Sequence, residues 1–72
     1  MDNFEVVAGI IEEVADIPKD EIEKESSLID DLDLSSLEIM TIINNISRKF
    51  DVKITEQQIL EIETVADILA VL

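Results

Sequence analysis

Two adjacent serines, Ser35 and Ser36, are the residues of this 72-residue chain best placed for chemistry, because an apolar helical pattern follows them directly. Ser35 is a typical helix N-cap, and Glu38 three positions later completes the capping-box pattern. Ser36 then occupies the first helical position. There, free backbone N–H groups and the positive end of the helix dipole would favour an attached phosphate.

Catalysis by the chain itself is not expected. The sequence contains no Cys and no His, which removes thiolate nucleophiles, imidazole bases, disulfides and the usual zinc ligands. Paired carboxylates remain as acid and base candidates, but a small helical domain offers no cleft that would shift their pKa values. We therefore interpret the acids as solvated surface and predict a protein that is not an enzyme.

One acidic segment partly matches a calcium loop. Asp31, Asp33 and Ser35 have the spacing of its first ligands. The EF-hand pattern also requires Gly at the sixth position and Glu at the twelfth, where this chain has Ser36 and Ile42. No metal site is predicted.

The charge of the chain limits its partners. Eighteen acidic and five basic residues give a net charge of −13, which argues against nucleic acid and anionic lipid and favours basic protein surfaces. The N-terminal residues Met1 to Glu5 are acidic and the apolar runs are short, so neither a signal peptide nor a membrane span is expected. We expect a cytoplasmic monomer.

The elements that must position the serines are helical. One Gly and one Pro in 72 residues favour helices, and the length suits a single domain over residues 1–72. Apolar periodicity and capping signals predict an all-α, four-helix bundle with three longer helices and one short helix. The signals for the last two helices are Thr55 with Gln58 and Thr64 with Asp67. The expected helices span residues 2–15, 36–50, 56–60 and 65–72.

A long loop separates the first two expected helices. Its aliphatic residues alternate with acids, which suggests a loop pinned to the core rather than a free linker. The expected anchors are Leu28, Ile29, Leu32 and Leu34, and the acids among them are Asp30, Asp31 and Asp33.

The segment from Asp30 to Met40 resembles the phosphopantetheine attachment segment of acyl carrier proteins. The matching positions are Asp31-Leu32, Ser36-Leu37 and Glu38, with further landmarks at Ser26-Ser27-Leu28, Phe50-Asp51, Ile54 and Thr64-Val65. The resemblance implies that a phosphopantetheinyl transferase attaches 4'-phosphopantetheine from coenzyme A to Ser36. Acyl-loading and acyl-processing enzymes would then place fatty acyl, polyketide or aminoacyl units on its thiol as thioesters. The second Ser-Leu pair, Ser27-Leu28, opens no helix and is rejected as the site.

The expected second helix departs from the family pattern. In the family this helix is usually strongly acidic, whereas here it has one acid, Glu38, and two bases, Arg48 and Lys49. We therefore expect a more apolar or neutral docking contact and a specialised pathway. The expected partner-binding residues are Leu37, Glu38, Met40, Thr41 and Asn44. The alternative is an unmodified acidic helical module that binds a basic protein, with Ser36 only part of a helix start.

Overall fold

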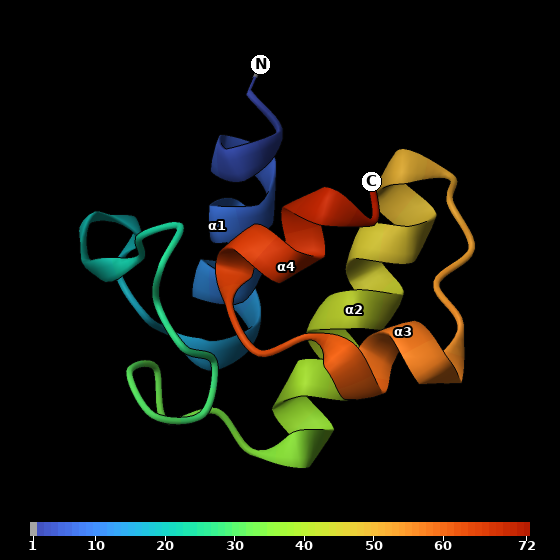
Figure 1. Ribbon diagram of the computed structural model, residues 1–72. Helices are drawn as coiled ribbons and strands as arrows, with labels where there is room; N and C mark the ends of the chain where they lie inside the picture. The colour runs from blue at the N-terminus through green and yellow to red at the C-terminus, as the bar shows by residue number, and fades with distance from the viewer. Residues whose placement is uncertain (1) are drawn as a thin grey trace.

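The computed structural model describes residues 2–72, and within them it contains four α-helices and no strand (Figure 1). The elements are α1 (Asn3–Ala15), a 3-10 turn η1 (Lys19–Glu21), α2 (Ser36–Phe50), α3 (Glu56–Glu61) and α4 (Val65–Ala70). This confirms the all-α fold with a long connection between the first two principal helices. The last helix ends at Ala70, so α4 has six residues, as α3 does. Among the described residues the longer helices are therefore α1 and α2, and the expectation of three longer helices was wrong because the apolar pattern of residues 65–72 continues past the end of α4.

Local side-chain caps explain where the helices begin. The Asp2 carboxylate accepts a hydrogen bond from the Phe4 N–H at 3.0 Å and so caps α1. Reciprocal capping boxes open the other helices at Ser35, Thr55 and Thr64, as the sequence predicted. None of the helices within residues 2–72 is long and apolar enough to cross a lipid bilayer.

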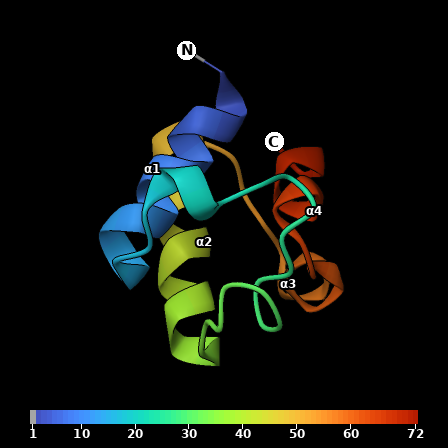
Figure 2. The same ribbon diagram turned by 90° about the vertical axis from the view of Figure 1, so that its left-hand side faces the viewer.

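The core lies where α1, α2 and α4 meet. α1 packs against α2 and also contacts α4 and the turn η1, an arrangement that Figures 1 and 2 show from two sides. The apolar residues that recur along each helix point into this core. Its buried members include Val7, Ile11, Ile42, Ile46, Val65 and Ile68.

The long loop is anchored, as predicted, but not by every expected residue. Leu28, Leu32 and Leu34 are buried, whereas Ile29 is 64% exposed, so its assignment as an anchor was wrong. The N–H groups of Asp31 and Leu32 both donate to the Ser27 carbonyl oxygen at 3.0 Å. This tight turn directs Leu28 and Leu32 inward and leaves Ile29, which lies between them in the chain, in solvent.

Backbone hydrogen bonds tie the loop to the connection between α3 and α4 and to the first turn of α4. The Leu28 N–H donates to the Glu63 carbonyl at 2.9 Å, and the Ala66 N–H donates to the Lys24 carbonyl at 2.8 Å. The Val65 N–H donates in turn to the Ser26 carbonyl at 3.2 Å. The loop that leads to α2 therefore has a fixed path.

Candidate functional site

The capping box at the start of α2 has the geometry predicted from the sequence. The Ser35 hydroxyl accepts a hydrogen bond from the Glu38 N–H at 3.2 Å. The Glu38 carboxylate accepts in return from the Ser35 N–H at 2.9 Å. Both side chains are thereby committed to the helix start. The Glu38 carboxylate, expected to contact partners, is the acceptor that closes this box.

Ser36 has no such commitment. Its side chain is exposed, and no hydrogen bond of its hydroxyl occurs among residues 2–72. In the same part of the chain, the backbone N–H groups of Ser36 and Leu37 have no protein acceptor. A free hydroxyl therefore lies beside two free donors at the positive end of a 15-residue helix. These residues fit an attached phosphate.

The loop holds this helix start in position. Leu34 is buried, and its N–H donates to the Leu28 carbonyl at 2.9 Å. Asp33, just before it, has a φ of 54°, the left-handed conformation that its residue type tolerates. The chain thus turns at Asp33, anchors at Leu34 and presents Ser36 to solvent.

Most of the predicted contact residues share the exposed side of α2. Leu37 is 79% exposed and Met40 is 41% exposed, and Thr41 and Asn44 are also exposed. The Thr41 hydroxyl donates to the Leu37 carbonyl at 2.9 Å, so it is partly satisfied within the helix. The surface next to Ser36 is therefore apolar at its start and neutral further along.

Two further apolar residues are exposed that were not expected from the sequence to be exposed. Leu60 on α3 is 83% exposed, and Ile29 in the loop is 64% exposed. No signal for Leu60 was present in the sequence, because adjacent helical residues can both be buried, as Ile42 and Ile43 are on α2. Ile29 had no signal either.

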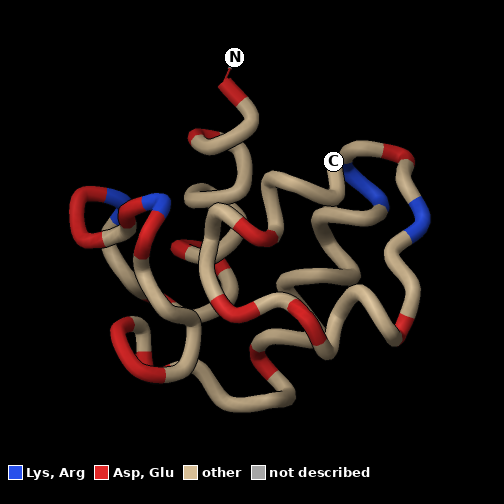
Figure 3. The backbone as a smooth tube through the Cα atoms, viewed as in Figure 1, with Lys and Arg blue, Asp and Glu red and all other residues tan. Residues whose placement is uncertain are grey.

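Charge is distributed unevenly over the molecule. Figure 3 shows acids over α1 and the connections, whereas most of α2 carries neither sign. The bases of α2, Arg48 and Lys49, are exposed in its last turn, where they interact favourably with the negative end of the helix dipole. Within residues 2–72 neither base lies within 4.0 Å of a carboxylate, and the Arg48 guanidinium donates to the Asn45 side chain at 3.3 Å.

Comparison with known proteins gives one consistent result. Residues 5–72 match the family model described as the phosphopantetheine attachment site. The chain is 38% identical over 64 residues to the acyl carrier protein of Kineococcus radiotolerans, covering 89% of this chain and 79% of that one. It is 31% identical over 70 residues to the acyl carrier protein of Helicobacter hepaticus, covering 97% and 92% of the two chains.

More specialised relatives and a solved structure extend this comparison. The meromycolate extension acyl carrier protein of Mycobacterium tuberculosis is 41% identical over 69 residues, which covers 92% of this chain and 60% of that one. A solved structure from M. tuberculosis, described as an acyl carrier protein, shares the fold with a TM-score of 0.91 at 24% identity, covering 97% and 93% of the two chains.

The fold and the matches define a phosphopantetheine-dependent carrier. The chain belongs to the acyl carrier protein family. Members of this family are carriers rather than catalysts, and they work with the enzymes that load and process their cargo. The chain therefore carries acyl or related intermediates as thioesters on a covalently attached 4'-phosphopantetheine.

Proposed function

We propose that Ser36 is the residue that bears 4'-phosphopantetheine, and that residues 1–72 act as one carrier domain that supplies no catalytic group. The observation that supports Ser36 best is its unused hydroxyl at the first position of α2. Ser35, its neighbour, already accepts the capping hydrogen bond from Glu38. Of the two adjacent hydroxyls, only that of Ser36 is available without loss of the helix cap.

The attachment step is a phosphoryl transfer. The Ser36 hydroxyl oxygen forms a bond to the phosphorus that carries the pantetheine unit in coenzyme A. The bond from that phosphorus to the adenosine portion breaks, adenosine 3',5'-bisphosphate leaves, and the serine proton passes to a base of the transferase. The free N–H groups of Ser36 and Leu37 would favour the resulting phosphodiester. When attached, the group supplies a terminal thiol for thioester formation.

An intact-mass experiment tests this assignment. The chain is incubated with coenzyme A and a phosphopantetheinyl transferase, beside the variants Ser36→Ala, Ser35→Ala and Ser27→Ala. We expect the mass of one phosphopantetheine on the wild type and on the last two variants, and none on Ser36→Ala. If the Ser36→Ala variant is still modified, the attachment site is a residue other than Ser36. No modification by several transferases would favour the unmodified acidic interaction module.

The pathway and the contact residues belong to the same proposal. The meromycolate extension relative supports a dedicated lipid pathway, and the neutral surface of Leu37, Met40, Thr41 and Asn44 supports docking that depends less on charge. If enzymes of general fatty acid synthesis elongate on this protein as efficiently as on a typical carrier, the specialised role is wrong. A cytoplasmic location is likewise proposed, and cell fractionation tests it.

A further inference from the structure

Four exposed residues form a line along α2 that we call the α2 stripe. Leu37, Thr41, Asn44 and Arg48 follow one another at spacings of four, three and four residues, which places them on one face of the helix. All four are exposed. The stripe begins beside Ser36 and ends at Arg48, about 18 Å away along the helix axis at ~1.5 Å per residue.

The stripe presents no free carboxylate. The acid of α2, Glu38, already accepts the Ser35 N–H, and its side chain is half-buried. Arg48 contributes a positive charge with no carboxylate within 4.0 Å among residues 2–72, although the whole chain carries −13. A basic enzyme would be attracted to the molecule as a whole, but this surface offers it no matching acid.

A partner that docks on the α2 stripe would have to provide hydrogen-bond acceptors for the Arg48 guanidinium. Its guanidinium has five N–H donors, of which one bonds the Asn45 side chain, so the rest depend on water. A close contact removes that water, and a buried cation without a partner costs free energy. The favourable arrangement opposes Arg48 with a carboxylate.

We propose that the α2 stripe docks an enzyme whose contacting surface is apolar where it meets Leu37 and carries a carboxylate opposite Arg48. This deepens the proposed carrier function and rests on it. The enzyme accepts the phosphopantetheine arm that extends from Ser36, so the opening of its active site faces Ser36. The enzyme's carboxylate, opposite Arg48, then lies about 18 Å from that opening, because twelve helical residues separate Ser36 from Arg48. Arg48 selects this partner over one that presents a basic residue at the same place.

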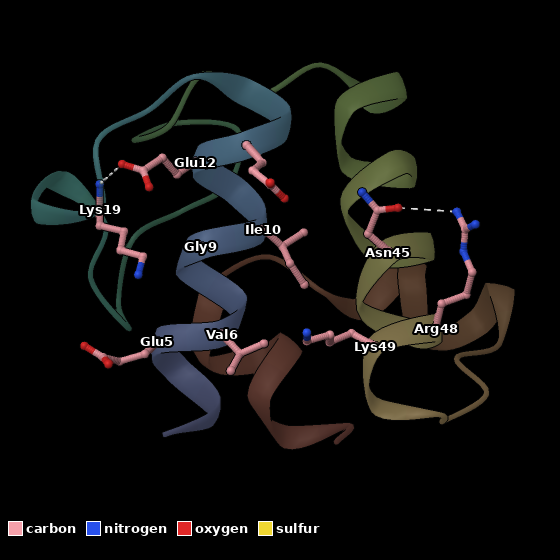
Figure 4. Close-up of a pocket in the computed structure, with 10 residues that line it drawn as sticks. Glu5, Val6, Gly9, Ile10, Glu12, Lys19, Asn45, Arg48 and Lys49 are labelled. Atoms are coloured by element: carbon pink, nitrogen blue, oxygen red, sulfur yellow. Dashed lines mark hydrogen bonds between the residues drawn. The ribbon is translucent and has the colours of Figure 1, made fainter. Parts of the chain in front are cut away.

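Lys49 is a matched control for Arg48. Both bases line the groove between α1 and α2, but Figure 4 shows the Lys49 side chain reaching across it toward Val6, whereas the Arg48 side chain points away from α1. Both bases belong to the last turn of α2. Arg48→Glu and Lys49→Glu therefore change the net charge and the helix dipole equally, and they differ in position relative to the stripe.

A crossover experiment tests the proposal. The probes are a phosphopantetheinyl transferase with a basic carrier-binding surface, and a variant in which the basic residues that face the C-terminal half of the carrier helix are replaced by Glu. Phosphopantetheine transfer to each chain is measured as kcat/KM by intact mass. We expect the wild-type carrier to have the higher kcat/KM with the charge-reversed transferase, and the Arg48→Glu carrier to have the higher kcat/KM with the original transferase. Each difference should be about fivefold at low salt. Lys49→Glu should keep the wild-type order.

Each result has a defined meaning. An equal effect of Arg48→Glu and Lys49→Glu, or no change of order, would overturn the α2 stripe as the docking surface while leaving the carrier function intact. Absence of transfer to every chain would overturn the proposed function itself. Arg48→Gln and Lys49→Gln provide milder variants if the charge reversals unfold the helix, and circular dichroism monitors folding. High salt should reduce the difference.

Discussion

The chain contains the dipeptide Ser-Leu twice, and the two copies have opposite roles. In Ser27-Leu28 the serine hydroxyl accepts from the Asp30 N–H at 3.2 Å, and the leucine is 2% exposed. In Ser36-Leu37 the serine hydroxyl is free and the leucine is 79% exposed. The first pair stabilises the loop, whereas the second faces solvent at the start of α2.

The difference between the pairs comes from their neighbours rather than from the dipeptide. Ser35 supplies the helix cap and so leaves the Ser36 hydroxyl unused. Ser27 also follows a serine, but the Ser26 hydroxyl accepts from the Glu23 N–H before it, so the Ser27 hydroxyl and carbonyl themselves close the turn that follows. The Ser36 hydroxyl is therefore available for reaction because the adjacent Ser35 makes the hydrogen bonds that cap the helix.

The largest expected contrast is between the two leucines. Leu28→Ala removes a buried side chain from the core and should lower the free energy of unfolding by about 2–5 kcal/mol, whereas Leu37→Ala should change it by less than about 0.5 kcal/mol. Urea unfolding followed by circular dichroism measures both. Leu28→Val gives a smaller loss if the Ala variant does not fold. Equal losses for the two Ala variants would show that Leu37 is part of the core.

A smaller contrast is expected between the adjacent serines. Ser35→Ala removes the cap of α2 and should cost about 1 kcal/mol of unfolding free energy, while Ser36→Ala should cost less than about 0.5 kcal/mol. The same urea titrations compare them. A loss for Ser36→Ala as large as that for Ser35→Ala would assign the Ser36 hydroxyl a structural role and weaken the comparison.

The free energy of unfolding should depend on pH through the connection between α3 and α4, where the Glu63 carbonyl accepts from the Leu28 N–H. Hydrogen bonds from the Glu63 and Thr64 N–H groups lower the pKa of the Asp67 carboxyl below its ordinary value of 3.8. A lowered folded pKa stabilises the fold fully above the ordinary value, and this contribution is lost as the pH falls through the folded value.

The test compares Asp67→Asn with the wild type by urea unfolding over a range of pH. Asn keeps an oxygen acceptor but does not titrate, so the wild type should be the more stable at neutral pH and should lose this small advantage in acid. A difference that stays constant from neutral pH to well below 3.8 would contradict the role of the Asp67 charge.

Local features of the fold were predictable from the sequence. The caps at Ser35, Thr55 and Thr64 depend on residues three positions apart, so their signals lie in the sequence itself. The positive φ of Asp33 is also compatible with its residue type, which tolerates that conformation better than most.

Features that depend on distant segments were not predictable. The hydrogen bond from Leu28 to the Glu63 carbonyl joins backbone groups far apart in the chain, and backbone groups leave no mark on residue type. The exposure of Ile29 was missed although the turn at Ser27 is local, because that turn is closed by backbone groups rather than by the Ile29 side chain. The separate directions of Arg48 and Lys49 likewise required the structure.

The most direct test of the central claim is to locate the added group within the chain. After modification with coenzyme A and a transferase, the protein is digested and the modified peptide is fragmented in a mass spectrometer. We predict the phosphopantetheine mass on Ser36, with Ser35 and Ser27 unmodified. Fragments that place it on Ser35 or Ser27 would contradict the account.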